Sequence, residues 1–139
     1  MGHAELTKGF CVLRILHVLD HSLPMHSGYT FRTRAILKAQ IEQGWAVAGV
    51  TGLRHSAGGA PEALEDGLTF FRTPEKNLLP SPIGEYQEIN ALAARLEGVV
   101  DQWKPDILHA HSPVMNALAA LRVGKSRSEE RHVGKECCR

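Results

Sequence analysis

Short, mostly apolar segments alternate with segments of helical periodicity along most of this chain. The apolar segments are residues 12–19, 46–51, 68–72 and 106–111. Continuous apolar runs of this length are typical of strands that are buried on both faces of a parallel sheet. A polar stretch rich in glycine, residues 54–62, is predicted to be a loop.

The first predicted helix follows the first strand and occupies residues 28–43. Its apolar residues Ile36, Leu37 and Ile41 share one face, so we expect that face to be buried. Gly44 follows directly and is a natural C-terminal stop.

Two further helices are predicted near the fourth strand. The first has Ser81 as its N-cap and Pro82 as its first residue, and it ends at residues 104–105. The second begins at Pro113 and continues through residues 116–123, which are rich in alanine and leucine. The longer of the two carries the clearest apolar stripe in the chain, formed by Ile89, Leu92, Leu96, Val99, Val100 and Trp103.

This alternation predicts an α/β fold with a Rossmann-like parallel sheet and helices on both faces. With the predicted strands numbered along the chain, the expected order is 3-2-1-4. Strands 1 and 4 would then be neighbours. The crevice between their C-terminal ends is where sheets of this kind bind ligands.

Three regions are expected along the chain. Residues 1–12 form an N-terminal extension, residues 13–124 form the Rossmann-like domain, and residues 125–139 form a tail. The tail holds eight charged residues and a single aliphatic one, Val133, so we predict that it is disordered. Two interpretations stay open for it, a native disordered tail and non-native sequence that resembles vector read-through.

Composition excludes several classes of protein. A formal net charge of +1 gives no general attraction to nucleic acid or anionic lipid, so any anion site must be local. Three cysteines, two of them adjacent at the C-terminus, do not make a disulfide framework. Since no segment has the length of a membrane span or the apolar core of a secretory signal, we expect a cytoplasmic protein.

Histidines gather at the predicted crevice. Of the eight in the chain, His17, His21, His26, His109 and His111 lie on strands 1 and 4 or just after them. His109 and His111 are two residues apart and therefore share one face of their strand. His17 lies inside an apolar strand, and we interpret it as a core histidine with its hydrogen bonds satisfied.

The start of the first helix is a candidate anion site. Gly28 allows the backbone to approach a ligand closely, and the free N–H groups and the dipole of a helix start favour a phosphate. Arg32 opposes that dipole unless an anion is near, while Arg34 is a weaker candidate and both could simply be exposed surface residues. The loop matches neither the dinucleotide-binding nor the P-loop pattern.

Metal and nucleophilic chemistry are not expected. No carboxylate pair or cysteine pair accompanies the histidines. There is no G-x-S-x-G motif, and Ser112 faces away from the adjacent His111. Cys11 has no plausible activating partner.

Two motifs resemble those of family 4 glycosyltransferases, which have the GT-B fold. They are ILHVLDHSLPMHSGYTFR at residues 15–32 and KPDILHAHSP at residues 104–113. The similarity spans about residues 13–124, and it looks strongest to the glycosyltransferases of exosortase and exopolysaccharide gene clusters. The chain would then be a truncated half of a GT-B fold.

The resemblance implies a reaction and its substrates. A nucleotide-sugar donor would pass its sugar to a glycan or lipid-linked acceptor with retained anomeric configuration, without a metal and without a further cofactor. A lipid-linked acceptor would bring the protein to the inner face of the membrane, and Arg32, Arg34 and Lys38 are a weak basic signal for such contact.

The resemblance also assigns roles to residues. In the family, the N-terminal domain mainly holds the acceptor and the C-terminal domain holds the donor. His111 would be the catalytic residue. The residues that would contact the donor phosphate are Ser27, Gly28, Tyr29 and Arg32. The residues on the acceptor side would be His21, His26, His109 and Ser112.

Two departures from the family pattern matter. The usual pair of glycines in the first loop is Ser27-Gly28 here. The glutamate motif and basic residues of the donor domain have no counterpart, so we expect the C-terminal donor domain to be missing and this fragment to be inactive by itself.

Two other classes of function remain open. One is a stand-alone α/β module that binds a phosphorylated or sugar ligand without turning it over, and the other is a pseudoenzyme scaffold. A His111→Ala substitution would impair ligand binding in a transferase or a binding module, but not in a scaffold.

Overall fold

The computed structural model describes residues 12–55 and 60–131, with side chains as far as Arg127. The elements in that part of the chain are, in order, β1 (Arg14–Leu19), α1 (Gly28–Glu42), β2 (Ala46–Thr51), β3 (Glu62–Glu65), β4 (Leu68–Arg72), α2 (Ile83–Trp103), β5 (Ile107–Ala110) and α3 (Met115–Arg131).

The strands form one sheet in the order β3-β4-β2-β1-β5. β1 pairs in parallel with β2 and β5, and β2 pairs in parallel with β4. The predicted α/β class and mostly parallel sheet are therefore confirmed. The strand order differs from the expected 3-2-1-4 by one added strand, because β3 pairs antiparallel with β4 at the edge.

β3 was not predicted, and it overlaps the predicted loop at residues 54–62 only at Glu62. The strand is short and half exposed, so it lacks the apolar run that marks the other strands. Asp66 and Gly67 connect β3 to β4, with φ values of 53° and 75°. An Asp-Gly pair with positive φ is typical of a tight hairpin turn, and this local signal was available in the sequence.

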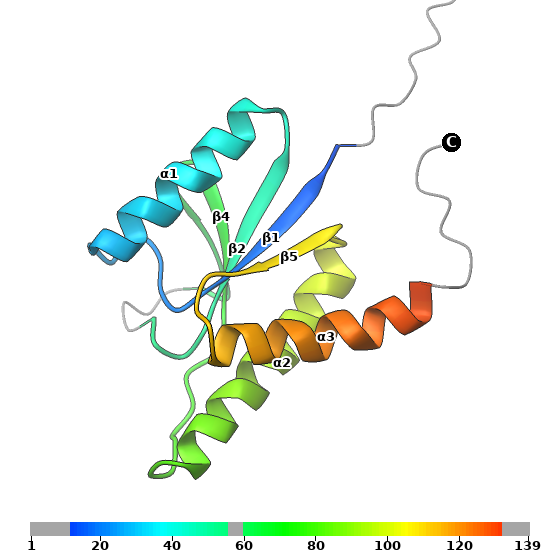
Figure 1. The fold of residues 1–139 in the computed structure, drawn as a ribbon. Coiled ribbons are helices and arrows are strands. Elements are labelled where there is room, and N and C mark those ends of the chain that lie inside the picture. The colour runs from blue at the N-terminus through cyan, green and yellow to red at the C-terminus, as the bar shows by residue number, and fades with distance from the viewer. Residues whose placement is uncertain (1–11, 56–59, 132–139) are drawn as a thin grey trace, which may run out of the picture.

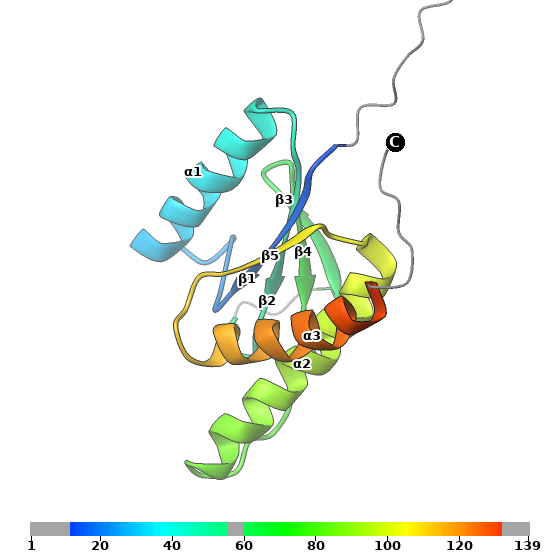
Figure 2. The same ribbon diagram turned by 45° about the vertical axis from the view of Figure 1, so that its right-hand side comes forward.

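Helices cover both faces of the sheet, as predicted. α1 lies on one side, and α2 and α3 lie together on the other, which Figures 1 and 2 show from two directions. Leu16 and Val18 of β1 pack toward α2 and α3, whereas Leu19 packs with Leu37 of α1. Alternate residues of one strand thus build two separate cores.

The buried face of α1 differs from the prediction. Leu37 is buried as expected, but Ile41 is 44% exposed, and the other buried positions are Thr30 and Thr33. The helix is rotated so that Gln40 reaches a polar residue of the sheet, His17. The predicted end is confirmed, because Gly44 follows α1 with a φ of +84°.

α2 buries the predicted stripe but begins later than predicted. Leu92, Leu96 and Val99 are almost fully buried. Pro82 occupies the N-cap position without a side-chain hydrogen bond. Ser81 is not the cap, because its hydroxyl donates to the Glu85 carboxylate at 3.0 Å.

α3 continues past the predicted domain end at Gly124. The prediction that the tail is disordered was wrong for residues 125–131, because they form the last turns of α3. Arg127 explains the difference. Its Nη2 lies 2.6 Å from a carboxylate oxygen of Asp101 in α2, so this charged residue is paired with another helix instead of being solvated in a tail. Residues 132–139 of the predicted tail and residues 1–11 of the N-terminal extension lie outside the described residues.

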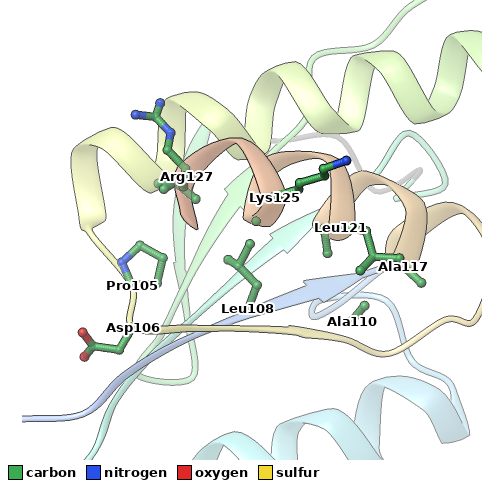
Figure 3. Close-up of a pocket in the computed structure, with 11 residues that line it drawn as sticks. Pro105, Asp106, Leu108, Ala110, Ala117, Leu121, Lys125 and Arg127 are labelled. Atoms are coloured by element: carbon green, nitrogen blue, oxygen red, sulfur yellow. The ribbon is translucent and has the colours of Figure 1, made fainter. Parts of the chain in front are cut away.

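An apolar groove of about 810 Å³ lies between β5 and α3 (Figure 3). Leu108 and Ala110 of β5 face Ala117 and Leu121 of α3 across it. β5 is the last strand on this side of the described sheet. None of the residues predicted for the site lines this groove.

Candidate functional site

The C-terminal ends of β1 and β5 meet, as the predicted strand order requires. His17 and His109 are register partners on the two strands. The backbone N–H of His111 donates to the Val18 carbonyl at 3.0 Å, which extends the pairing past the end of β5. The three imidazoles His17, His109 and His111 consequently lie within reach of one another, and we call them the histidine cluster.

A chain of hydrogen bonds connects α1 to His111. Gln40 Oε1 lies 2.7 Å from Nε2 of the buried His17, and His17 Nδ1 lies 2.7 Å from His111 Nε2. An amide oxygen can only accept, so His17 carries its proton on Nε2 and accepts at Nδ1. His111 therefore donates from Nε2 and keeps its Nδ1 lone pair as an acceptor.

Two members of the cluster are neutral at physiological pH. Burial lowers the pKa of His17 to about 4, and the Gln40 hydrogen bond opposes part of that change. Burial also lowers the pKa of His111 to about 4, and charge on His17, His109 and Arg32 acts in the same direction. These rings therefore act as hydrogen-bond partners and not as cations.

The start of α1 presents open backbone donors near the cluster. Ser27 is the N-cap, and its Oγ accepts from the Thr30 N–H at 3.1 Å and lies 2.8 Å from His21 Nε2. Within the described residues the N–H groups of Gly28 and Tyr29 have no hydrogen-bond acceptor, and the first turn of α1 carries no acid. A Cβ added at Gly28 would meet nothing within 4 Å. This helix start can therefore accept an anion.

Tyr29 lies between the helix start and the histidine cluster. Its hydroxyl accepts from the Asp20 N–H at 3.2 Å, and burial raises its pKa. Its ring centroid is 4.8 Å from that of His21 and 6.4 Å from that of His111. The Arg32 guanidinium lies 5.7 Å above the Tyr29 ring, which brings a cation to this region.

Arg34 and Lys38, the neighbouring cations of α1, form ion pairs within the protein. Arg34 and Lys38 both pair with Asp66 Oδ2, at 2.5 and 2.9 Å. These two contacts lower the pKa of Asp66. The weak basic signal of the sequence is thus partly neutralised within the protein.

Ser112 acts with a carboxylate that the sequence reasoning did not select. Its hydroxyl donates to Asp20 Oδ2 at 2.6 Å, and Asn116 Nδ2 donates to Asp20 Oδ1 at 3.1 Å. Asp20 follows β1 directly, and Asn116 is buried in the first turn of α3. The two hydrogen bonds hold the Asp20 carboxylate at the mouth of the crevice.

The structure brings together most of the predicted site but not all of it. Tyr29 contacts His111, and His21 contacts both Tyr29 and Ser27. His26 is instead exposed, and its ring centroid lies 5.5 Å from that of Phe31. The residues that the prediction missed are Gln40, Asp20 and Asn116. Gln40 had a usable signal, because it lies three residues after Leu37 and so on the same helix face.

A family comparison assigns most of the chain. The family model described as "Glycosyl transferase 4-like domain" matches residues 27–129. The chain belongs to this family. Comparisons with curated proteins and with solved structures gave no match. The matched region of this glycosyl transferase 4-like domain begins at Ser27 and includes His109 and His111, while His17 and His21 precede it.

Proposed function

We propose that this glycosyl transferase 4-like domain forms the acceptor side of a retaining, metal-independent glycosyltransferase. The reaction would move a sugar from a nucleotide-sugar to a glycan or lipid-linked acceptor, in the context of exopolysaccharide synthesis. The observation that carries the proposal is the contact of Tyr29, at the open start of α1, with His111, a neutral histidine oriented by His17.

Each part of this arrangement suits glycosyl transfer. As the bond to the leaving diphosphate breaks, negative charge accumulates on its oxygens. The N–H groups of Gly28 and Tyr29 and the cation of Arg32 would stabilise that charge, without a metal. The Nδ1 lone pair of His111 would accept a hydrogen bond from a hydroxyl of the donor sugar and fix its position beside the acceptor.

The remaining polar residues would line the acceptor side. His21 is held by Ser27, and Ser112 is held by Asp20, so both have defined positions before a ligand arrives. Preorganised groups bind a ligand with a smaller loss of conformational entropy. A glycan hydroxyl is a suitable partner for such groups because it both donates and accepts.

Contact with a membrane is the last part of the proposal. Within residues 12–55 and 60–131 no helix is long and apolar enough to cross a bilayer. Arg32 is exposed and available to an anionic surface, while Arg34 and Lys38 already pair with Asp66. We therefore propose at most a peripheral contact, through a lipid-linked acceptor.

The experiment that tests the diphosphate site is a titration with inorganic pyrophosphate, followed by NMR of the backbone amides. We expect the amides of Gly28 and Tyr29 to shift most. A Gly28→Ala variant should bind at least about tenfold more weakly, a loss of about 1.4 kcal/mol, because its methyl group would fill the space that the anion needs.

Gly98→Ala is the matched control for this experiment. Gly98 lies in α2, and an added Cβ there also meets nothing within 4 Å, so the variant should bind pyrophosphate as the wild type does. Equal affinities of Gly28→Ala and wild type, or shifts located away from the start of α1, would contradict the proposed diphosphate site.

A further inference from the structure

The histidine cluster gathers three potential ligands of a transition metal. One potential ligand atom from each of His17, His109 and His111 lies within 4.8 Å of the others. The ring centroids are separated by 5.0 Å for His17 and His109, 5.0 Å for His17 and His111, and 4.4 Å for His109 and His111. One ring nitrogen of each histidine thus lies near the other two, although the His109 and His111 rings are stacked with an interplanar angle of 21°.

The backbone explains why the rings converge. His109 and His111 occupy alternate positions at the end of β5 and therefore project from the same face. His17 projects from that face of β1 and is the register partner of His109. Two histidines at i and i+2 with a third on the adjacent strand can supply three ligands to one ion without any rearrangement of the backbone.

A residue outside the cluster orients one of the ligands. Gln40 Oε1 holds Nε2 of His17 at 2.7 Å, so the Nδ1 lone pair of His17 points at the cluster. Histidines that bind metals usually donate their second ring N–H to an oxygen acceptor, and this contact fixes the tautomer and the ring orientation. Gln40 supplies such an acceptor from a different element, α1.

We propose that His17, His109 and His111 bind a divalent transition cation, with Zn²⁺ as the best match. Three imidazoles without a carboxylate favour zinc, copper or nickel over magnesium or calcium. His109 is exposed and leaves a fourth position open toward solvent. This proposal goes beyond the transferase reaction and does not depend on it.

Binding requires the side chains to rotate, because an ion lies in the plane of each ring that binds it and the stacked rings of His109 and His111 have nearly parallel planes. A tetrahedral zinc ion with bonds of about 2.0–2.1 Å separates its ligand nitrogens by roughly 3.4 Å, whereas His17 Nδ1 and His111 Nε2 are 2.7 Å apart. The His17–His111 hydrogen bond opens, and the proton of His111 moves from Nε2 to Nδ1. The ring then coordinates through Nε2, and the count of protons on the protein does not change.

Coordination would alter the chemistry of the crevice. The Nδ1 atom of His111 would change from an acceptor to a donor, so a sugar hydroxyl at this ring would have to accept the hydrogen bond instead of donating it. In an active transferase the cation would therefore change the orientation of the hydroxyl that His111 contacts.

The test is Co²⁺ binding to the untagged full chain, followed by visible absorption and displacement with Zn²⁺. All variants carry Ser in place of Cys11, Cys137 and Cys138, since thiolates also bind these ions. We expect saturation at one equivalent, with the intense bands of tetrahedral Co²⁺. His109→Gln and His111→Gln should each weaken binding at least about tenfold, and circular dichroism will show that they remain folded.

His26→Gln is the matched control, because His26 is an exposed histidine outside the cluster. It should bind Co²⁺ with the wild-type affinity. The proposal is overturned if only the weak bands of octahedral Co²⁺ are seen, if both cluster variants bind as the wild type does, or if His26→Gln causes the same loss. Pyrophosphate binding at Gly28 is measured separately, so either proposal can fail without the other.

Discussion

At the scale of single residues, Gln40 orients His111 without contacting it. The Gln40 oxygen fixes the proton of His17 on Nε2, and His17 in turn fixes the proton of His111. The acceptor at His111 Nδ1 thus depends on a side chain in α1. This arrangement makes Gln40 a positioning residue for the proposed transferase.

We predict that Gln40→Leu removes the contact that sets the tautomers of His17 and His111. The His17 Nε2–H loses its partner, which costs about 1–3 kcal/mol of the free energy of unfolding when such a group stays buried. His17 and His111 should then populate both neutral tautomers. Urea unfolding measures the first effect, and the nitrogen chemical shifts of the two imidazoles measure the second.

The control for this change is Gln43→Leu, which replaces an exposed glutamine just after the same helix. It should leave both the stability and the imidazole shifts unchanged. If Gln40→Leu leaves the His111 tautomer as in the wild type, the hydrogen-bond chain does not set it.

At the scale of elements, a glycine in β2 makes room for the Phe70 ring of the neighbouring strand β4. Gly49 is the register partner of His17 on one side and of Phe70 on the other. A Cβ placed at Gly49 would lie 2.7 Å from Phe70 Cδ1 and 3.1 Å from Leu19 Cδ1. Phe70 is only 2% exposed, so its ring has little room to move away.

We therefore predict that Gly49→Ala lowers the free energy of unfolding by about 1–3 kcal/mol, the usual cost of overpacking a core. Denaturant unfolding gives the value. Gly98→Ala in α2 should instead raise stability by up to about 1 kcal/mol, because helix interiors favour alanine and its Cβ meets open space. A Gly49→Ala variant that is as stable as the wild type would show that β2 and β4 can move apart with little loss of free energy of unfolding.

At the scale of the whole molecule, stability should depend on pH through buried neutral histidines. His55 is 8% exposed, and its Nδ1 accepts from the Ser22 N–H at 3.3 Å and lies 3.4 Å from the Arg72 guanidinium. Burial, then the charges of Arg72 and His21, lower its pKa from 6.5 to about 4. A second proton would have to sit on Nδ1, where two donors already point.

The direction of the pH effect follows from the two pKa values. Between about pH 6.5 and pH 4 the unfolded chain binds a proton at His55 that the folded protein does not, so stability falls as the pH falls. From about pH 7.5 to about pH 5 this residue should cost roughly 2 kcal/mol. Urea unfolding at the two pH values measures the loss.

His55→Asn should remove that share of the pH dependence, while His26→Gln, which changes an exposed histidine, should keep it. An unchanged slope in His55→Asn would mean that the folded protein takes up the proton at His55 without penalty.

The sequence by itself determined the frame of this protein. Apolar runs and a helical stripe are local patterns, and they were sufficient to predict the parallel strands, the helices on both faces and the adjacency of β1 and β5. Adjacency then placed His17, His109 and His111 at one end of the sheet. The start of α1 was equally visible, because Ser27 and Gly28 are chemical signals for a helix N-terminus.

Tertiary structure alone decided how these parts connect. His17 reaches His111 across 94 residues and Gln40 across 23, and neither contact follows from a local period. The rotation of α1 depends on the His17 ring, which Gln40 of that helix contacts. The length of α3 depends on acidic side chains of α2 that pair with Arg127. Periodicity fixes which face of an element is apolar, but hydrogen bonds and ion pairs between elements depend on register and rotation, which form only when the elements pack together.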